Sequence, residues 1–196
     1  NLFSSSTIDR MARTIGDVDE LDALGNSDQA RFLPVYNTKV LVANKAGRLT
    51  AAAIEKAELT SRFSCVTSPV YLGRKNDLHY FAVGVKVADE EVEIFTDLRQ
   101  SAALLSDNDA ALLGYALAIL TWQRNHQHCS ACGAPTVIRQ GGHVLQCNDP
   151  ACAREHYPRT DPAIIVLVEH GDRALFGRKA EWPVHRYSTI AGFVEP

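Results

Sequence analysis

The chain has 196 residues, 46% of them hydrophobic, and a formal net charge of −3 at pH 7, so it can bury a core and is long enough for more than one domain. This mild acidity provides no broad electrostatic surface for nucleic-acid phosphates, and no apolar run approaches the roughly 20 residues of a membrane-spanning helix. Five cysteines, four of them in close pairs, favour a reducing compartment, the cytoplasm, over a secreted disulfide scaffold.

Residues 1–105 are predicted to form one strand-rich domain. Runs of β-branched and aromatic residues, broken by short polar turns, predict two hairpins, which join 32–36 to 39–42 and 79–87 to 92–95. The alanine-rich segment 51–59 predicts a short helix between them, and a further strand follows Ser68-Pro69. This domain contains no catalytic signature. His79 is interpreted as an ordinary strand histidine.

Residues 106–125 are predicted to form a helix that connects the first domain to the next. Ser106 and Asp109 have the spacing of a capping box. Apolar side chains then recur at intervals of three and four residues, at Leu113, Ala116, Leu117 and Leu120. We interpret this apolar stripe as core packing. Arg99, just upstream, is on sequence alone a solvated charge.

The most informative feature of the chain is a cluster of four cysteines between residues 126 and 157. They form two short pairs, Cys129-x2-Cys132 and Cys147-x4-Cys152. The spacer between them spells strand, Gly141-Gly142 turn and strand, and this arrangement is typical of a zinc ribbon.

Other interpretations of the cluster remain open. The cysteines could be reduced core thiols or form two disulfides, and any of four nearby histidines could replace a thiolate: His126, His128, His143 and His156. Four thiolates already complete a tetrahedron and leave no position for substrate, so the predicted zinc is structural and contributes folding free energy.

Residues 158–196 are predicted to begin a third domain. A continuous apolar run at 163–168 has the length of a buried strand, 173–178 returns as a second strand, and 187–190 leads into Ala191-Gly192-Phe193-Val194-Glu195-Pro196.

These signals together resemble the NADH pyrophosphatase branch of the Nudix hydrolases. The resemblance rests on the ribbon, the link His156-Tyr157-Pro158-Arg159-Thr160-Asp161-Pro162, the pair Trp182-Pro183 and the segment Ala191 to Pro196. It implies an α+β chain: a strand-rich N-terminal domain, the ribbon, and the opening strands of an α/β/α Nudix fold. It further implies a homodimer that hydrolyses the pyrophosphate bond of NAD(H), giving nicotinamide mononucleotide and AMP. Related enzymes also remove NAD caps from RNA.

The implied chemistry needs Mg or Mn, held mainly by glutamates of the Nudix box. Gly192 matches the first glycine of that box, and the box glutamates would lie beyond Pro196. No catalytic residue is therefore assigned in this chain. We expect the chain to be a fragment, with a naturally shortened, non-catalytic homologue as the alternative.

The resemblance also implies roles for individual residues. Phe193 matches an aromatic that stacks on a base of the dinucleotide, Tyr157 a second pocket aromatic contributed across the dimer, and Arg99 a substrate-contacting arginine. The backbone carbonyl of Ala191 matches a metal-binding position. An acidic substrate-contacting position of the family is occupied here by Gly142. The alternative interpretation of Phe193 and Tyr157 is that both are core aromatics.

Three functional hypotheses follow. The first is an NAD(H) diphosphatase, of which residues 1–196 alone are expected to be inactive because they lack the box glutamates. The second is a non-catalytic module for zinc-dependent dimerisation or nucleotide binding. The third is a nucleic-acid-binding ribbon, which the net charge disfavours.

Overall fold

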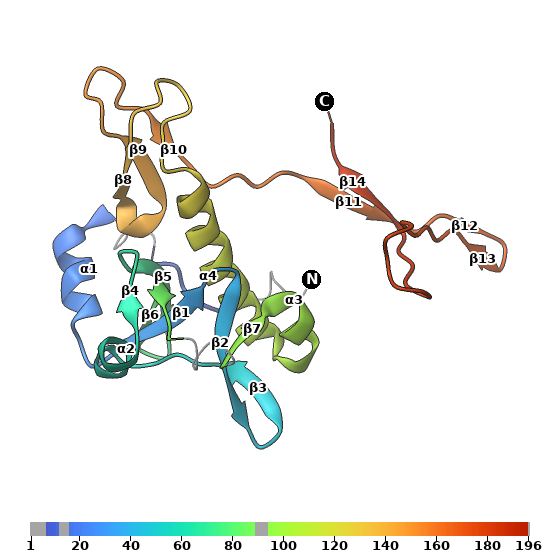
Figure 1. Ribbon diagram of the computed structural model, residues 1–196, viewed down its shortest axis with the longest axis horizontal. Coiled ribbons are helices and arrows are strands. Elements are labelled where there is room, and N and C mark those ends of the chain that lie inside the picture. The colour runs from blue at the N-terminus through green and yellow to red at the C-terminus, as the bar shows by residue number, and fades with distance from the viewer. Residues whose placement is uncertain (1–6, 12–15, 89–93, 196) are drawn as a thin grey trace. The chain divides into compact units, whose positions relative to one another are not determined.

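A mixed sheet of seven strands forms the centre of the first unit in the computed structural model, which describes residues 7–11, 16–88 and 94–195. The chain divides into two compact units, Asn1–Pro158 and Arg159–Pro196. The elements up to the ribbon (Figure 1) are α1 (Val18–Gly25), β1 (Ala30–Tyr36), β2 (Lys39–Lys45), β3 (Arg48–Ala51), α2 (Lys56–Arg62), β4 (Ser64–Cys65), β5 (Val70–Lys75), β6 (Leu78–Lys86), β7 (Phe95–Asp97), α3 (Leu98–Ser101), a 3-10 turn (Ala102–Leu104) and α4 (Asp107–Asn125).

The strands follow the order β3-β2-β1-β6-β4, with β5 also paired to β6 and β7 to β2. β1 and β6 run parallel, from the Ala30/His79 pair to the Val35/Gly84 pair, and the other described pairs of this sheet are antiparallel. A parallel pair requires a long crossover, which β2 to β5 and α2 provide here. The result is an α+β domain, as predicted.

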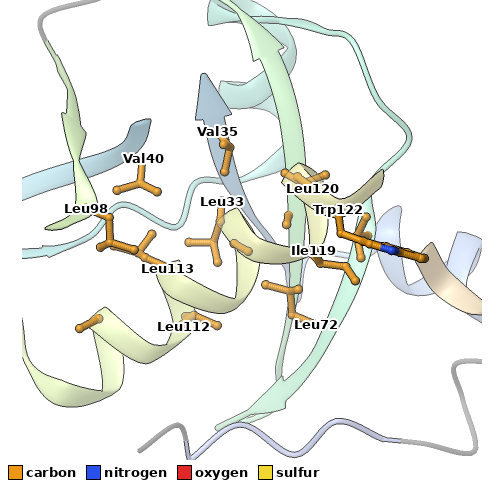
Figure 2. Packing of buried hydrophobic residues seen from close by; sticks show 14 of the residues in the cluster. Leu33, Val35, Val40, Leu72, Leu98, Leu112, Leu113, Ile119, Leu120 and Trp122 are labelled. Carbon is orange, nitrogen blue, oxygen red and sulfur yellow. The ribbon is translucent and has the colours of Figure 1, made fainter. Parts of the chain in front are cut away.

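Helices cover both faces of this sheet. Successive side chains of a strand point to opposite faces, so each strand contributes apolar residues to a core on either side. Leu33 and Val35 of β1 belong to the cluster that includes Leu113 and Leu120 of α4 (Figure 2). Phe32, adjacent to Leu33 in β1, belongs to a second cluster, which contains Leu59 of α2 and contacts the partly buried Leu21 and Leu24 of α1. The domain therefore has three layers, with α4 on one face and α1 and α2 on the other.

The predicted helix at 106–125 is confirmed as α4. Ser106 is its N-cap, and its hydroxyl oxygen accepts a hydrogen bond from the backbone N–H of Asp109 at 3.2 Å. The apolar stripe packs into the first core, so the helix is part of that domain as well as a link to the ribbon. Neither α4 nor any other helix in the described part of the chain is long and apolar enough to cross a membrane.

The first predicted hairpin is confirmed and the second is wrong. β1 and β2 pair around Asn37-Thr38, with Val35 opposite Val40. The predicted partner of β6 is 92–95, of which residues 92 and 93 lie outside the described residues, and Phe95 begins β7, which pairs with β2. The physical reason is that both edges of β6 are already occupied, by β1 on one side and by β4 and β5 on the other.

The predicted helix at 51–59 begins later than expected. Ala51 is the last residue of β3, and Ile54 exchanges two backbone hydrogen bonds with Phe32, at 2.8 and 2.9 Å. These backbone bonds hold the alanine-rich stretch extended despite its helix propensity, and α2 starts only at Lys56.

The ribbon is a three-stranded antiparallel sheet in the order β10-β9-β8. Its strands are β8 (Thr136–Arg139), β9 (Val144–Cys147) and β10 (Glu155–His156), with a 3-10 turn at Gln140–Gly142. This confirms the predicted strand, glycine turn and strand between the cysteine pairs.

The second unit consists of two small antiparallel sheets. β11 (Ala163–Val166) pairs with β14 (Ile190–Phe193), and β12 (Glu169–His170) pairs with β13 (Arg173–Ala174). The predicted strand at 173–178 is therefore shorter than expected. Ile165 is 78% exposed and Phe193 74%, so the described residues of this unit do not cover the apolar sheet.

Candidate metal centre

Two backbone knuckles hold the four cysteines. In the first, the N–H of Gly133 donates to the carbonyl of Cys129 at 2.9 Å, and the N–H of Ala131 points at the Cys129 sulfur at 3.4 Å. Gly133 has a φ of +77°, which a residue without a Cβ adopts at little cost. This turn brings the Cys129 and Cys132 sulfurs to the same side of the knuckle.

An aspartate organises the second knuckle and explains its wider spacing. The side chain of Asp149 accepts a hydrogen bond from the N–H of Ala151 at 2.9 Å, and its carbonyl accepts from Cys152 and Ala153, at 3.0 and 2.7 Å. The side chain thus forms a local turn that takes up the four intervening residues. Cys147 and Cys152 can therefore face the first pair of cysteines.

The four sulfurs have the geometry of a zinc site. They all lie within 4.8 Å of one another, and the Cys129–Cys152 and Cys132–Cys147 sulfur distances are 3.8 and 3.4 Å. Zn–S bonds of about 2.3 Å in a tetrahedron place sulfurs about 3.8 Å apart. The donor set fits a structural zinc ion, and the cluster, searched over the described residues, contains no histidine.

The protein environment differs between the thiols. Backbone N–H groups of Ala131 and Cys132 lower the pKa of Cys129 to about 6, whereas burial raises the pKa of Cys147 to about 12. Four adjacent thiolates repel one another, so a bound dication is needed to hold all four deprotonated.

The turn of the ribbon is docked onto the first domain. The carbonyl of Gly142 accepts a hydrogen bond from Nε2 of Gln123 in α4 at 2.7 Å, and Nε2 of His143 donates to the carbonyl of Tyr71 in β5 at 2.7 Å. Burial lowers the pKa of His143, and the hydrogen bond to Tyr71 offsets part of this shift. This contact was not predicted from the amino-acid sequence, in which the two adjacent glycines and the glutamine on an apolar helix face are the signals for it.

The structure explains the glycine at position 142. Its φ is +100°, and a Cβ there would lie 2.6 Å from Cγ1 of Val70 and 3.0 Å from Nε2 of Gln123. A larger side chain, including the acidic one of the family pattern, cannot be placed without moving the ribbon away from β5.

The predicted substrate residues are distributed over both units. Arg99 lies exposed in α3, and its backbone N–H donates to Asp97 at 2.9 Å. Tyr157 is 58% exposed and its hydroxyl donates to Glu155. Phe193 and Ala191 share β14, opposite Ala163 and Ile165. Neither aromatic ring is buried by the described residues, and the roles of all four residues stay predictions.

His79 has the ordinary strand environment expected of it. It is buried in β6, and its Nδ1 lies 3.0 Å from the hydroxyl of Tyr71. Burial lowers its pKa. The ring is a core group paired with a neighbouring strand.

Comparison with known proteins agrees with this architecture. Residues 29–122 match the family model of an NADH pyrophosphatase-like rudimentary NUDIX domain, and residues 124–157 match the NADH pyrophosphatase zinc ribbon domain. The first range contains the seven-stranded sheet and most of α4. The second contains all four cysteines.

Individual relatives carry related names. The chain is 43% identical over 99 residues to the NAD-capped RNA hydrolase NudC of Stutzerimonas stutzeri. This match covers 50% of this chain and 35% of the relative. It is 37% identical over 145 residues to Nudix hydrolase 19, chloroplastic, of Arabidopsis thaliana. This match covers 66% of this chain and 33% of the relative.

A third relative matches along nearly the whole chain. This is the NAD-capped RNA hydrolase NudC of Mycobacterium tuberculosis strain H37Rv, 35% identical over 201 residues, with 99% of this chain and 61% of the relative covered. The chain therefore spans less than two thirds of the length of these relatives. Through its Nudix-like domain and its zinc ribbon, the chain belongs to the NADH pyrophosphatase family of Nudix hydrolases.

Proposed function

We propose that this chain is part of an NAD(H) diphosphatase, which hydrolyses the pyrophosphate bond of NADH or NAD to nicotinamide mononucleotide and AMP and also removes NAD caps from RNA. The observation that carries the proposal is the succession, in one chain, of a Nudix-like domain, a docked zinc ribbon and the Ala191–Pro196 segment. The names of the relatives support the substrate class. Thiols held reduced for zinc suit a cytoplasmic location.

The structural zinc and the catalytic metal have separate roles in this proposal. Mg or Mn would neutralise the diphosphate and activate a water, for which a group of carboxylates is required. Among the described residues, the only group of three or more side chains spaced to hold a metal is the four-cysteine cluster. The residues present therefore do not fit the catalytic ions, and the carbonyl of Ala191 would contribute a single ligand.

The chain's own contribution to the reaction is therefore substrate binding. The exposed ring of Phe193 offers a flat apolar face to a base, as does Tyr157, which we propose acts across a homodimer. Arg99 places an exposed guanidinium in α3, suited to a phosphate oxygen. The ribbon supports Tyr157 because β10 leads directly into it.

The test compares the 196-residue chain with the complete product of its gene. Each is incubated with NADH and Mg or Mn, and nicotinamide mononucleotide and AMP are separated by chromatography. We expect no turnover above background from the chain alone and turnover from the complete product. Phe193→Ala in an active protein should weaken dinucleotide binding by about 1 kcal/mol. Robust metal-dependent turnover by the 196-residue chain would refute the assignment of the chemistry to carboxylates beyond it.

The second candidate is a non-catalytic module for zinc-dependent dimerisation or nucleotide binding. It is favoured by the absence, among the described residues, of a cluster of carboxylates spaced to hold a metal and by the exposed apolar side chains of β11 and β14. An inactive complete gene product that still binds NADH would favour this candidate over the first.

A further inference from the structure

A cavity of about 660 Å³ lies between the first domain and the ribbon. Its walls come from the C-terminal end of α4, from β1 and β6, from the loop between β4 and β5, and from β8 and β9 of the ribbon. Sites for small organic molecules enclose about 300–1,000 Å³. The cavity therefore has the size of a ligand site, and it involves none of the proposed substrate residues.

One part of the cavity wall is apolar. The first domain contributes Val35, Val85 and Leu120, and the ribbon contributes Ile138 and Leu145. A ligand body that contacts both sets must itself be largely apolar, because it replaces water against aliphatic side chains. Inorganic phosphate alone would leave these walls unused.

The charged part of the wall favours an anion. Arg124 lines the cavity, and its Nη1 donates to the carbonyl of Asn37 at 3.0 Å. No carboxylate among the residues that the structure describes forms an ion pair with it, and the described lining contains no aspartate or glutamate. The remaining guanidinium donors are thus suited to a phosphate or carboxylate group.

Uncharged polar groups complete the lining. The Thr67 hydroxyl oxygen accepts a hydrogen bond from the N–H of Gly84 at 2.8 Å, which leaves its proton as a donor. Gln123 also lines the cavity, and its Nε2 is held by the carbonyl of Gly142 at 2.7 Å. A few oriented polar groups in an apolar wall are the usual composition of a small-molecule site.

We propose that this cavity binds a small organic anion: an apolar, ring-sized body carrying one anionic group on Arg124. Two of its apolar walls belong to ribbon strands, so the site forms only when the ribbon is folded around zinc. Binding at this site is independent of the proposed hydrolysis and does not require the Nudix glutamates.

The test uses three probes with the zinc-loaded 196-residue chain: 1-naphthyl phosphate, 1-naphthol and inorganic phosphate. Titration calorimetry is expected to show the naphthyl phosphate binding at least ten-fold more tightly than either of the others, because only it engages both the apolar walls and Arg124. Equal binding of naphthol, or no measurable binding of the naphthyl phosphate, would overturn the proposal.

Two pairs of variants locate the site. Arg124→Gln should weaken naphthyl phosphate binding at least ten-fold, to the affinity that naphthol shows. Its control is Arg48→Gln, which replaces an exposed arginine in β3 and should leave naphthyl phosphate binding unchanged. Val66→Trp places a large side chain from an exposed loop position into the cavity and should abolish binding. Val18→Trp, at a comparably exposed position in α1, is its control.

Thermal melting of each variant establishes that it is folded before titration. Naphthyl phosphate binding that survives both Arg124→Gln and Val66→Trp in folded protein would place the ligand elsewhere and refute the proposal. Chelation of zinc should abolish binding to the unsubstituted chain. Undiminished affinity after confirmed zinc removal would contradict the contribution of the ribbon.

Discussion

Replacing Gly142 by alanine tests whether the ribbon is rigidly docked on the first domain. The new Cβ would lie 2.6 and 2.8 Å from the two methyl carbons of Val70 and 3.0 Å from Nε2 of Gln123, all closer than a Cβ normally approaches. Both neighbours are buried, so they have little room to move. The substitution must therefore either displace the turn or deform the core beside it.

The cost has two parts. A φ of +100° costs a residue with a Cβ about 1–3 kcal/mol, and forcing a methyl group into a filled site costs a further 1–3 kcal/mol or so. We expect Gly142→Ala to lower the free energy of unfolding by about 2–6 kcal/mol. At about 2–4 °C per kcal/mol for a chain of this size, the melting temperature should fall by roughly 4 °C or more.

Gly47→Ala is the matched control. Gly47 also has a positive φ, +81°, but a Cβ there would meet nothing within 4 Å, so the substitution adds backbone strain without a clash. Both variants are unfolded with urea in the presence of zinc, and amide spectra report whether His143 and its neighbours move. If Gly142→Ala costs no more than Gly47→Ala, the close docking of the turn onto β5 is wrong.

Three further predictions concern zinc, pH and the helix cap. Cys132→Ser should reduce bound zinc, measured by metal analysis, and unfold the ribbon, because the metal closes a loop with little apolar core; an unchanged zinc content and melting curve would contradict this. Burial lowers the pKa of His143 below the unfolded value of about 6.5, so the unfolded chain binds more protons in acid, and stability falls as the pH drops below about 6.5. His143→Gln should make this loss smaller in urea titrations, and an identical pH profile for both proteins would refute it. Ser106→Ala removes the 3.2 Å cap to Asp109 and should cost about 1 kcal/mol, whereas Ser106→Asp should retain most of the stability.

The elements that the sequence predicted correctly depend on neighbouring residues. The start of α4 follows from Ser106 and Asp109, three residues apart, and the first hairpin follows from a polar pair between two apolar runs. The strands of the ribbon follow from the same kind of pattern around Gly141-Gly142. In each case the interaction that decides the structure lies within a few residues along the chain.

The elements that were predicted wrongly from the sequence depend on backbone partners that are distant along the chain. The choice of β2 as the partner of β7 depends on the occupation of both edges of β6, which involves segments from Ala30 to Lys86. The delayed start of α2 depends on the backbone bonds between Ile54 and Phe32. A local pattern contains no information on these pairings.

The zinc ribbon and the family could be predicted from the amino-acid sequence, because ligand type and spacing indicate a four-thiolate zinc site and the motifs around it occur in a fixed order. How the ribbon meets the first domain depends on contacts that exist only in the folded chain. The contacts of Gly142 with Val70, of Gln123 with Gly142 and of His143 with Tyr71 join segments 19 to 72 residues apart in the chain. They exist because the folded sheet brings β5 and α4 to the same place, and the cavity beside Arg124 is a consequence of that meeting.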